Sequence, residues 1–131
     1  MSQQSNLLRW GTIALGAGLI AFSAPGIVAP RRFARAVGIP APDHPASDVG
    51  IHSVSVRDVV MGIGLISAAV HGGRLAPWLL ARTLCDGGDA VAIALAFARG
   101  GGNPRLGALG VVAAGAAAYD AVLWRLAKRS A

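Results

Sequence analysis

Apolar residues fill four segments of this chain, and short stretches rich in glycine, proline and arginine separate them. Each segment is close to the roughly 20 residues that an α-helix needs to cross the hydrocarbon core of a bilayer. The pattern predicts an all-α polytopic membrane protein, an antiparallel four-transmembrane-helix bundle in a single integral membrane domain over residues 1–131. The four spans are predicted at residues 7–24, 50–70, 77–98 and 104–126.

Turn and capping residues mark the ends of these segments. Pro25 follows the first segment and is expected to loosen its end, since proline lacks the N–H that continues a helix. Ser47 or Asp48 is the expected N-cap of the second segment, and Asn103 caps the fourth. Loops this short make successive helices antiparallel neighbours. The first segment also has the character of a secretory signal, but the later membrane-like segments favour a first membrane helix.

A short amphipathic segment lies between the first two spans. Phe33 and Val37 are four residues apart, which puts both on one face of a helix. Arginines occupy the other face, so this helix is predicted to lie along the membrane interface. Near the end of the fourth span, an aromatic residue is at a depth typical of the interface. The predicted membrane-interface residues are Arg31, Arg32, Phe33, Arg35 and Trp124.

Composition supports the membrane interpretation. Hydrophobic residues make up 54% of the chain and charged residues only 14%, against about 25% in soluble domains. The net charge of +6 comes mainly from arginines at the ends of apolar segments. This distribution suits anionic lipid headgroups, whereas a nucleic-acid surface needs a solvated basic face or stacking aromatics. We therefore expect a lipid bilayer as partner and no nucleic acid. The alanine-, glycine- and arginine-rich composition favours a bacterial inner membrane.

Orientation in that membrane stays open. The basic residues outside the spans divide evenly between the two ends of the predicted bundle. The positive-inside rule therefore favours neither direction. The even number of spans places both termini on the same side.

Motifs of enzyme chemistry are few. Cys85 is the only cysteine, which excludes an intrachain disulfide and a paired redox motif. The three histidines lie in different segments without metal-ligand spacing, so neither a metal nor another cofactor is predicted. Asp86 and Asp89 have the spacing of boxes that bind magnesium diphosphates. Enzymes of that kind need a second acidic motif, which Asp120 alone does not provide. An enzyme is therefore the least favoured interpretation.

Six ionisable residues fall inside the predicted spans. Facing lipid at the centre of a helix, each would cost about 2.5–3.5 kcal/mol. All six are therefore expected to face the bundle interior and to find partners there. The predicted buried charge network consists of Arg57, Asp58, Arg82, Asp86, Asp89 and Asp120.

Depth along the helices predicts the partners. Arg82 is about six residues from the start of the third span and Asp120 about six from the end of the fourth, so we pair them. Arg57 and Asp89 reach similar depth from the opposite end and form the second predicted pair. Asp86 is a further candidate partner of Arg57. Two aspartates, Asp58 and Asp86, have no other clear partner.

The predicted network is not neutral. Two arginines and four aspartates carry a formal charge of −2, which a low-dielectric interior does not hold uncompensated. The excess negative charge is compensated within the chain if one or two carboxyls are protonated, if His52 is charged, or if Arg9 reaches inward. Alternatively the bundle holds a cation, an amine or a basic residue of a partner. The candidate ligand- or cation-binding residues are Asp58, Asp86, Asp89, His52 and Ser55.

Several elements occur together in one order. Phe33-Ala34 and Gly38-Ile39-Pro40 precede Val56-Arg57-Asp58-Val59-Val60-Met61-Gly62, followed by Arg82, Asp86-Gly87-Gly88-Asp89 and Asp120. Over about residues 8–127 the chain resembles a family of small four-helix integral membrane proteins known as a domain of unknown function. It is distantly similar to DoxX-like membrane proteins. The Arg-Asp-x-x-x-Gly element is the most specific part. The resemblance implies a four-helix membrane bundle and supplies no reaction.

These observations predict a small integral membrane protein that acts as an accessory, scaffold or partner-binding bundle, with mainly structural buried charges. A proton-, cation- or amine-handling bundle that uses the unpaired aspartates is the first alternative. An intramembrane lipid-modifying enzyme is the second. The expected protein partner is another membrane protein or a second copy of this chain, through small-residue helix faces.

Overall fold

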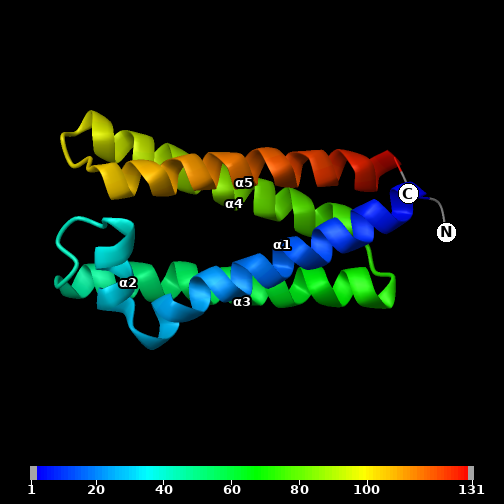
Figure 1. Cartoon of the computed structure of the whole chain (residues 1–131), viewed down its shortest axis with the longest axis horizontal. Coiled ribbons are helices and arrows are strands. Elements are labelled where there is room, and N and C mark those ends of the chain that lie inside the picture. The colour runs from blue at the N-terminus through cyan, green and yellow to red at the C-terminus, as the bar shows by residue number, and fades with distance from the viewer. Residues whose placement is uncertain (1–2, 130–131) are drawn as a thin grey trace.

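The structure, a computed structural model, describes residues 3–129 and is all-α (Figure 1). The short helix α2 (Pro30–Val37) lies between the first two of four long helices, as predicted. The start of α1 and the end of α5 lie at one end of the molecule, and α2 lies at the other (Figure 1). The long helices therefore alternate in direction. They are α1 (Gln3–Val28), α3 (Pro45–His71), α4 (Leu75–Ala98) and α5 (Pro104–Arg129).

The long helices form two tight pairs, α1 with α3 and α4 with α5, and the two pairs meet less closely (Figure 1). Two glycines explain the first pair. A Cβ atom on Gly16 would lie 2.7 Å from the carbonyl oxygen of Gly62, and one on Gly62 would lie 2.6 Å from that of Gly16. The two backbones are thus in direct contact, which only glycine permits at both positions.

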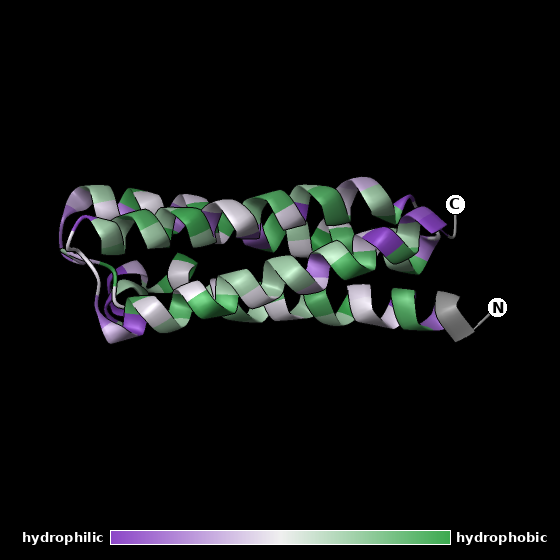
Figure 2. Cartoon of the chain, turned by 90° about the horizontal axis from the view of Figure 1, so that it is seen from above, coloured by the Kyte–Doolittle hydropathy of each residue, from purple (hydrophilic) through white to green (hydrophobic). Residues whose placement is uncertain are grey.

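Polar and charged side chains are buried beside an apolar core, while many large apolar side chains are exposed on the outer surface. Large apolar residues on all four long helices are more than half exposed, among them Leu7, Ile63, Leu84 and Val111. Figure 2 shows hydrophobic residues along the helices and hydrophilic ones gathered mainly in the loops and at the ends. A water-soluble domain buries such apolar residues. The buried polar residues are Thr12, Ser23, Ser55, Asp58, Arg82, Asp86 and Asp120.

Within residues 3–129, three helices are long and apolar enough to cross a membrane: Asn6–Val28, Pro45–His71 and Pro104–Arg129. These segments correspond to three of the four predicted spans. Helix α4 has a similar length, but Arg82, Asp86 and Asp89 interrupt its apolar sequence. Length and composition therefore identify the chain as a helical protein with several candidate membrane spans.

Several helix ends differ from the predicted ones. Helix α1 continues through Pro25 to Val28, because proline near the last turn removes only one hydrogen bond and its carbonyl still accepts one from the N–H of Ala29 at 2.9 Å. Helix α3 begins at Pro45, earlier than predicted. Its N-cap is His44, whose Nδ1 accepts from the N–H of Ala46 at 3.1 Å. The predicted caps, Ser47 and Asp48, lie inside the helix, since proline favours the first helical position.

Helix α2 is amphipathic, as predicted, but its apolar face points into the bundle. The ring of Phe33 meets that of Phe22 edge-to-face, with centroids 5.4 Å apart. Ala34 is buried, and Gly38 ends the helix in the left-handed region with φ 81°. The arginines lie on the outside, where Arg31 pairs with Asp48 and Arg35 with Asp43. Arg32 is exposed, and Trp124 packs against the core beneath the Nζ of Lys128.

Asn103 joins the start of α5 to the end of α2, and the predicted cap is confirmed. Its Oδ1 accepts from the N–H groups of Arg105 and Leu106 at 3.1 and 3.0 Å. Its Nδ2 donates to the carbonyl oxygen of Gly38 at 2.7 Å. A side chain with both bonds fixes the α2 end of the bundle.

Replacing Asn103 with alanine is expected to lower the free energy of unfolding by about 1–2 kcal/mol, because the helix loses its cap. Denaturant titration in mild detergent measures this loss. The variant Asn103→Asp keeps the acceptor and loses the donor to Gly38. It is therefore expected to be more stable than Asn103→Ala. Equal stability of the two variants would contradict a capping role.

Candidate functional site: a charge network at the end of an apolar cavity

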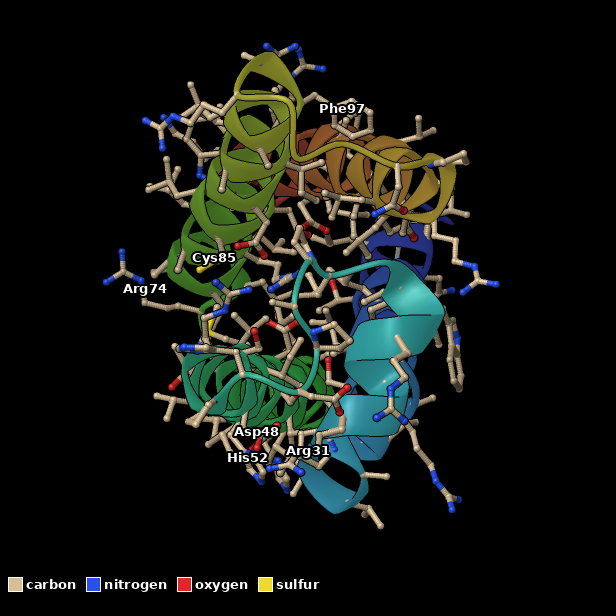
Figure 3. All side chains as sticks on the ribbon, turned by 90° about the vertical axis from the view of Figure 1, so that its left-hand side faces the viewer. Arg31, Asp48, His52, Arg74, Cys85 and Phe97 are labelled. Atoms are coloured by element: carbon tan, nitrogen blue, oxygen red, sulfur yellow. The ribbon has the colours of Figure 1, made fainter. Side chains whose placement is uncertain are left out.

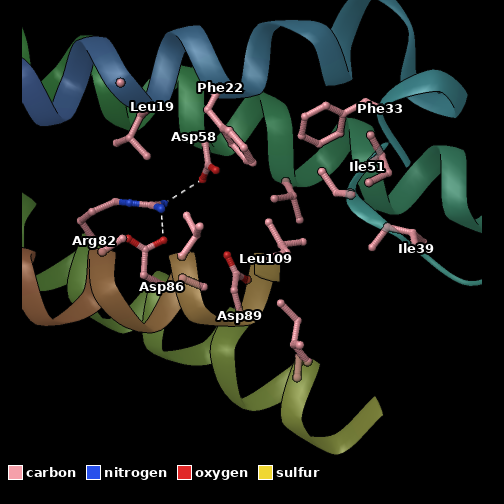
Figure 4. A pocket seen from close by; sticks show the side chains of 18 of the residues that line it. Leu19, Phe22, Phe33, Ile39, Ile51, Asp58, Arg82, Asp86, Asp89 and Leu109 are labelled. Atoms are coloured by element: carbon pink, nitrogen blue, oxygen red, sulfur yellow. Dashed lines mark hydrogen bonds and ion pairs between the residues drawn. The ribbon is translucent and has the colours of Figure 1, made fainter. Parts of the chain in front are cut away.

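Arg82 of α4 lies at the centre of the bundle and is only 3% exposed. Its Nη1 donates to Oδ1 of Asp58 in α3 at 2.8 Å, and its Nη2 donates to Oδ1 of Asp86 one helical turn away. Its Nε lies 3.9 Å from Oδ2 of Asp120 in α5, without a hydrogen bond. One guanidinium thus faces three carboxylates from three helices, and Figure 4 shows its contacts with Asp58 and Asp86.

Asp58 connects this centre to the remaining helix and to a second arginine. Its Oδ2 accepts from the hydroxyl of Ser23 in α1 at 3.2 Å, and its Oδ1 accepts from Nε of Arg57 at 3.0 Å. Arg57 also donates through Nη1 and Nη2 to the two oxygens of Asp89, at 3.3 and 2.6 Å. The side chains of Arg57 and Asp89 are 30% and 34% exposed, so this pair forms the outer edge of the network.

Both predicted ion pairs are present, and the second has additional members. Arg57 and Asp89 form the first predicted ion pair. Arg82 forms the second with Asp120 at 3.9 Å, but its hydrogen bonds go to Asp58 and Asp86. The prediction that Asp58 and Asp86 lack partners was therefore wrong. Matching depth identifies residues at one level of the bundle, but the rotation of each helix about its axis decides which of them meet.

Ser23 was missed by the sequence reasoning. It is the one serine in the first apolar segment and is buried in the structure. Its hydrogen bond to Asp58 means that all four long helices contribute to the network. An isolated serine at the depth of intramembrane charges was the available signal, since buried polar groups in lipid need partners.

Two residues predicted as candidate ligands lie away from this centre. His52 is exposed, with Nδ1 3.2 Å from the carbonyl oxygen of Asp48, and Figure 3 shows it on the outer side of α3. Ser55 is buried, but its side chain fills the space beside Gly26 of α1. Arg9, considered as a charge that reaches inward, lies over the ring of Trp10, 5.9 Å from its centroid.

The network keeps its negative formal charge in the structure. Among the described residues, only Arg57 and Arg82 form ion pairs with its four carboxylates. Both oxygens of the fully buried Asp120 and Oδ2 of Asp86 accept no hydrogen bond within residues 3–129. The centre of the bundle therefore has unused acceptors and more carboxylates than cations.

A cavity of about 530 Å³ extends from this network to α2. Figure 4 shows the charged residues at one end and aromatic and aliphatic side chains along the rest. The volume lies within the range of small-molecule sites, about 300–1,000 Å³. Its charged lining residues are Asp58, Arg82, Asp86 and Asp89, and its larger apolar ones include Leu15, Leu19, Phe22, Phe33, Val37, Ile39, Ile51, Val54, Ile93, Leu109 and Val112.

Comparison of the chain with family models, curated proteins and solved structures finds no match. Within the described residues, no cluster of three or more histidine, cysteine or acidic side chains has the arrangement of a metal site. The cavity and the charge network are therefore the features of the molecule from which a function can be inferred.

Proposed function

We propose that this protein is a multi-pass membrane protein with four transmembrane helices that binds a small, mainly apolar molecule in the cavity between its two helix pairs. The cavity with one charged end is the observation that supports binding most directly. Protein interiors are close-packed, and few voids in them exceed the size of a water molecule. A network that only held the helices together would need no cavity of this size.

Helix α4 is the fourth membrane span in this proposal. Arg82 and Asp86 point into the bundle, while Leu84 and Val91 on its outer side are more than half exposed. Charged residues within membrane spans generally face the bundle interior or a cavity, because exposing a charge to lipid is costly. The single domain is placed in the bacterial inner membrane. The exposed arginines of α2 lie at one end of the bundle, at the level of lipid headgroups.

We also propose that the chain is related to the four-helix domain of unknown function, on the basis of the Arg-Asp-x-x-x-Gly element. Arg57 and Asp58 of its most specific element belong to the charge network. Gly62, the last residue of that element, is the site of contact between α1 and α3. The element thus combines the tightest helix contact with the buried charges.

An accessory or scaffold role is the second candidate function. Gly115 and Ala118 are exposed on α5, and a Cβ atom on Gly115 would meet no atom within 4 Å. Small residues on a lipid-facing helix allow close approach of another membrane helix. Such a face suits a second copy of this chain or another membrane protein, and it is compatible with a ligand in the cavity.

Filling the cavity is expected to abolish ligand binding. Ala113 lines the cavity, and phenylalanine there would occupy part of its volume. With dodecanol in lipid nanodiscs as the probe, we expect it to raise the thermal midpoint of the wild type but not of Ala113→Phe. A ligand that binds only the folded state raises the midpoint in this way.

The matched control is Ala114→Phe, the same change one residue further along α5. Ala114 is exposed on the outer surface and does not line the cavity. This variant should respond to dodecanol like the wild type. If dodecanol raised the thermal midpoint of all three proteins equally, or of none of them, the result would contradict a binding function of the cavity.

A further inference from the structure

We propose that the ligand of this cavity is a hydrophobic amine, bound with its ammonium group beside Asp86 and Asp89 and its apolar body directed toward α2. This inference rests on the proposed binding function and specifies its ligand. Three observations support it: the charge of the deep end, the hydrogen-bonding capacity left there, and the direction in which the cavity changes from charged to apolar.

The charge at the network end of the cavity favours a cation as ligand. Three carboxylates and one guanidinium line this end of the cavity, and Arg57 and Asp120 add one charge of each sign beside it. The cluster as a whole has a formal charge of −2. A monovalent cation reduces this excess in a medium where unpaired charge is strongly unfavourable. An anion would increase it.

The unused hydrogen-bonding capacity at this end includes a buried carboxylate oxygen that lines the cavity. Both Nη atoms of Arg82 already donate to Asp58 and Asp86, and its Nε faces Asp120. Asp86 is 2% exposed and lines the cavity, and its Oδ2 accepts no hydrogen bond within the described chain. A ligand group that donates N–H can use this oxygen. The Nε of Arg82 also makes no hydrogen bond within residues 3–129, but it lies 3.9 Å from Oδ2 of Asp120, and a carboxylate ligand would add a further negative charge beside it.

The direction of the cavity excludes a bilayer lipid in its usual orientation. Asp58 is the middle residue of α3, so the charged end lies deep in the bundle. The apolar end lies at α2, where Phe22 and Phe33 meet. A phospholipid places its headgroup at the interface and its chains in the middle of the membrane. It would therefore set acyl chains against the carboxylates, whereas a compact amine with one nitrogen fits head first.

The seams between the helix pairs offer an entrance from the membrane. Val54 of α3 and Val112 of α5 both line the cavity and are exposed on the outer surface. The cavity therefore reaches the surface that lipid would cover. A hydrophobic amine that has partitioned into the bilayer can enter without crossing the polar ends of the bundle.

The test compares dodecylamine, dodecanol and dodecanoate in lipid nanodiscs at equal mole fraction, with the thermal midpoint as readout. These probes share one chain length and differ in the charge of the head. The change in midpoint of Ala113→Phe measures the effect of each probe on the bilayer and is subtracted from that of the wild type. Because hydrogen bonds to charged groups are the stronger ones, we expect dodecylamine to bind about tenfold more tightly than dodecanol. Dodecanoate should bind least.

Asparagine at Asp86 or Asp89 is expected to weaken the binding of dodecylamine more than that of dodecanol, so that the preference for the amine is lost. Asp89 is partly exposed, and among the described residues its ion pair is with Arg57 alone, so Asp89→Asn is the variant to test if Asp86→Asn does not fold. Asp43→Asn is the control, because Asp43 lies outside the network on an exposed pair with Arg35.

Three outcomes separate the two proposals. Equal binding of amine and alcohol, both lost in Ala113→Phe, would overturn the amine and keep the cavity as a binding site. Tighter binding of dodecanoate would also overturn the amine. If Ala113→Phe changes the response to none of the probes, the proposed binding function itself fails.

Discussion

Replacing Arg82 with methionine is expected to unfold the bundle in mild detergent. The change leaves Asp58, Asp86 and Asp120 buried around an apolar side chain, after removing the cation that faces all three. Removing one partner of a buried ion pair typically costs about 3–5 kcal/mol. Many domains are stable by only about 5–15 kcal/mol, so little would remain. Denaturant titration in detergent, followed by helical circular dichroism, measures the loss.

Arg57→Met is the matched control for this prediction. Arg57 belongs to the same network, but its side chain and that of Asp89 are each about a third exposed. Asp89 lines the cavity, where water can screen the carboxylate that remains, so the loss should be smaller. Adding Asp58→Asn to Arg82→Met removes one uncompensated charge and should recover part of the stability. Equal losses in Arg82→Met and Arg57→Met would show that Arg82 is not the centre of the network.

Replacing Gly16 with valine is expected to separate α1 from α3. Its Cβ would lie 2.7 Å from the backbone oxygen of Gly62, which cannot move without shifting the helix. Overpacking of this kind costs about 1–3 kcal/mol, and more when the backbone has to move. We expect a loss of about 3 kcal/mol in the free energy of unfolding. The same denaturant titration measures it.

Gly18→Val tests whether the effect is local to the contact. Gly18 is two residues further along α1, and a Cβ atom there would meet nothing within 4 Å. Both variants change helix propensity equally, so their difference isolates the contact with α3. If Gly16→Val is as stable as Gly18→Val, the close approach of the two backbones does not stabilise the pair.

The helices themselves were largely predictable from local patterns. The apolar segments, the amphipathic α2 and the Asn103 cap all appear in the structure, because they depend on residues within a few positions of each other. The His44 cap was not predicted, since His44 is not among the common capping residues and Pro45 moved the helix start. The end of α1 was misplaced because proline near a C-terminus breaks few bonds.

The candidate site was predictable only in part. All six charged residues that the sequence singled out meet in one network, because each is unfavourable against lipid. Asp120 was predicted as a partner of Arg82, but Asp58 and Asp86, to which Arg82 donates its hydrogen bonds, were not. Ser23 and the cavity were not predicted at all. His52 was predicted as a candidate ligand-binding residue and is exposed, away from the network, instead.

The sequence by itself determined that the chain is all-α, where its apolar helices lie, and that Arg57, Arg82 and four aspartates need partners. These properties follow from composition, periodicity and the cost of burying charge. Only the tertiary structure decided that Arg82 binds Asp58 and Asp86, and that a cavity separates the two helix pairs. Both depend on the rotation and spacing of whole helices. Contacts such as that between Gly16 and Gly62 set these quantities between residues far apart in the chain.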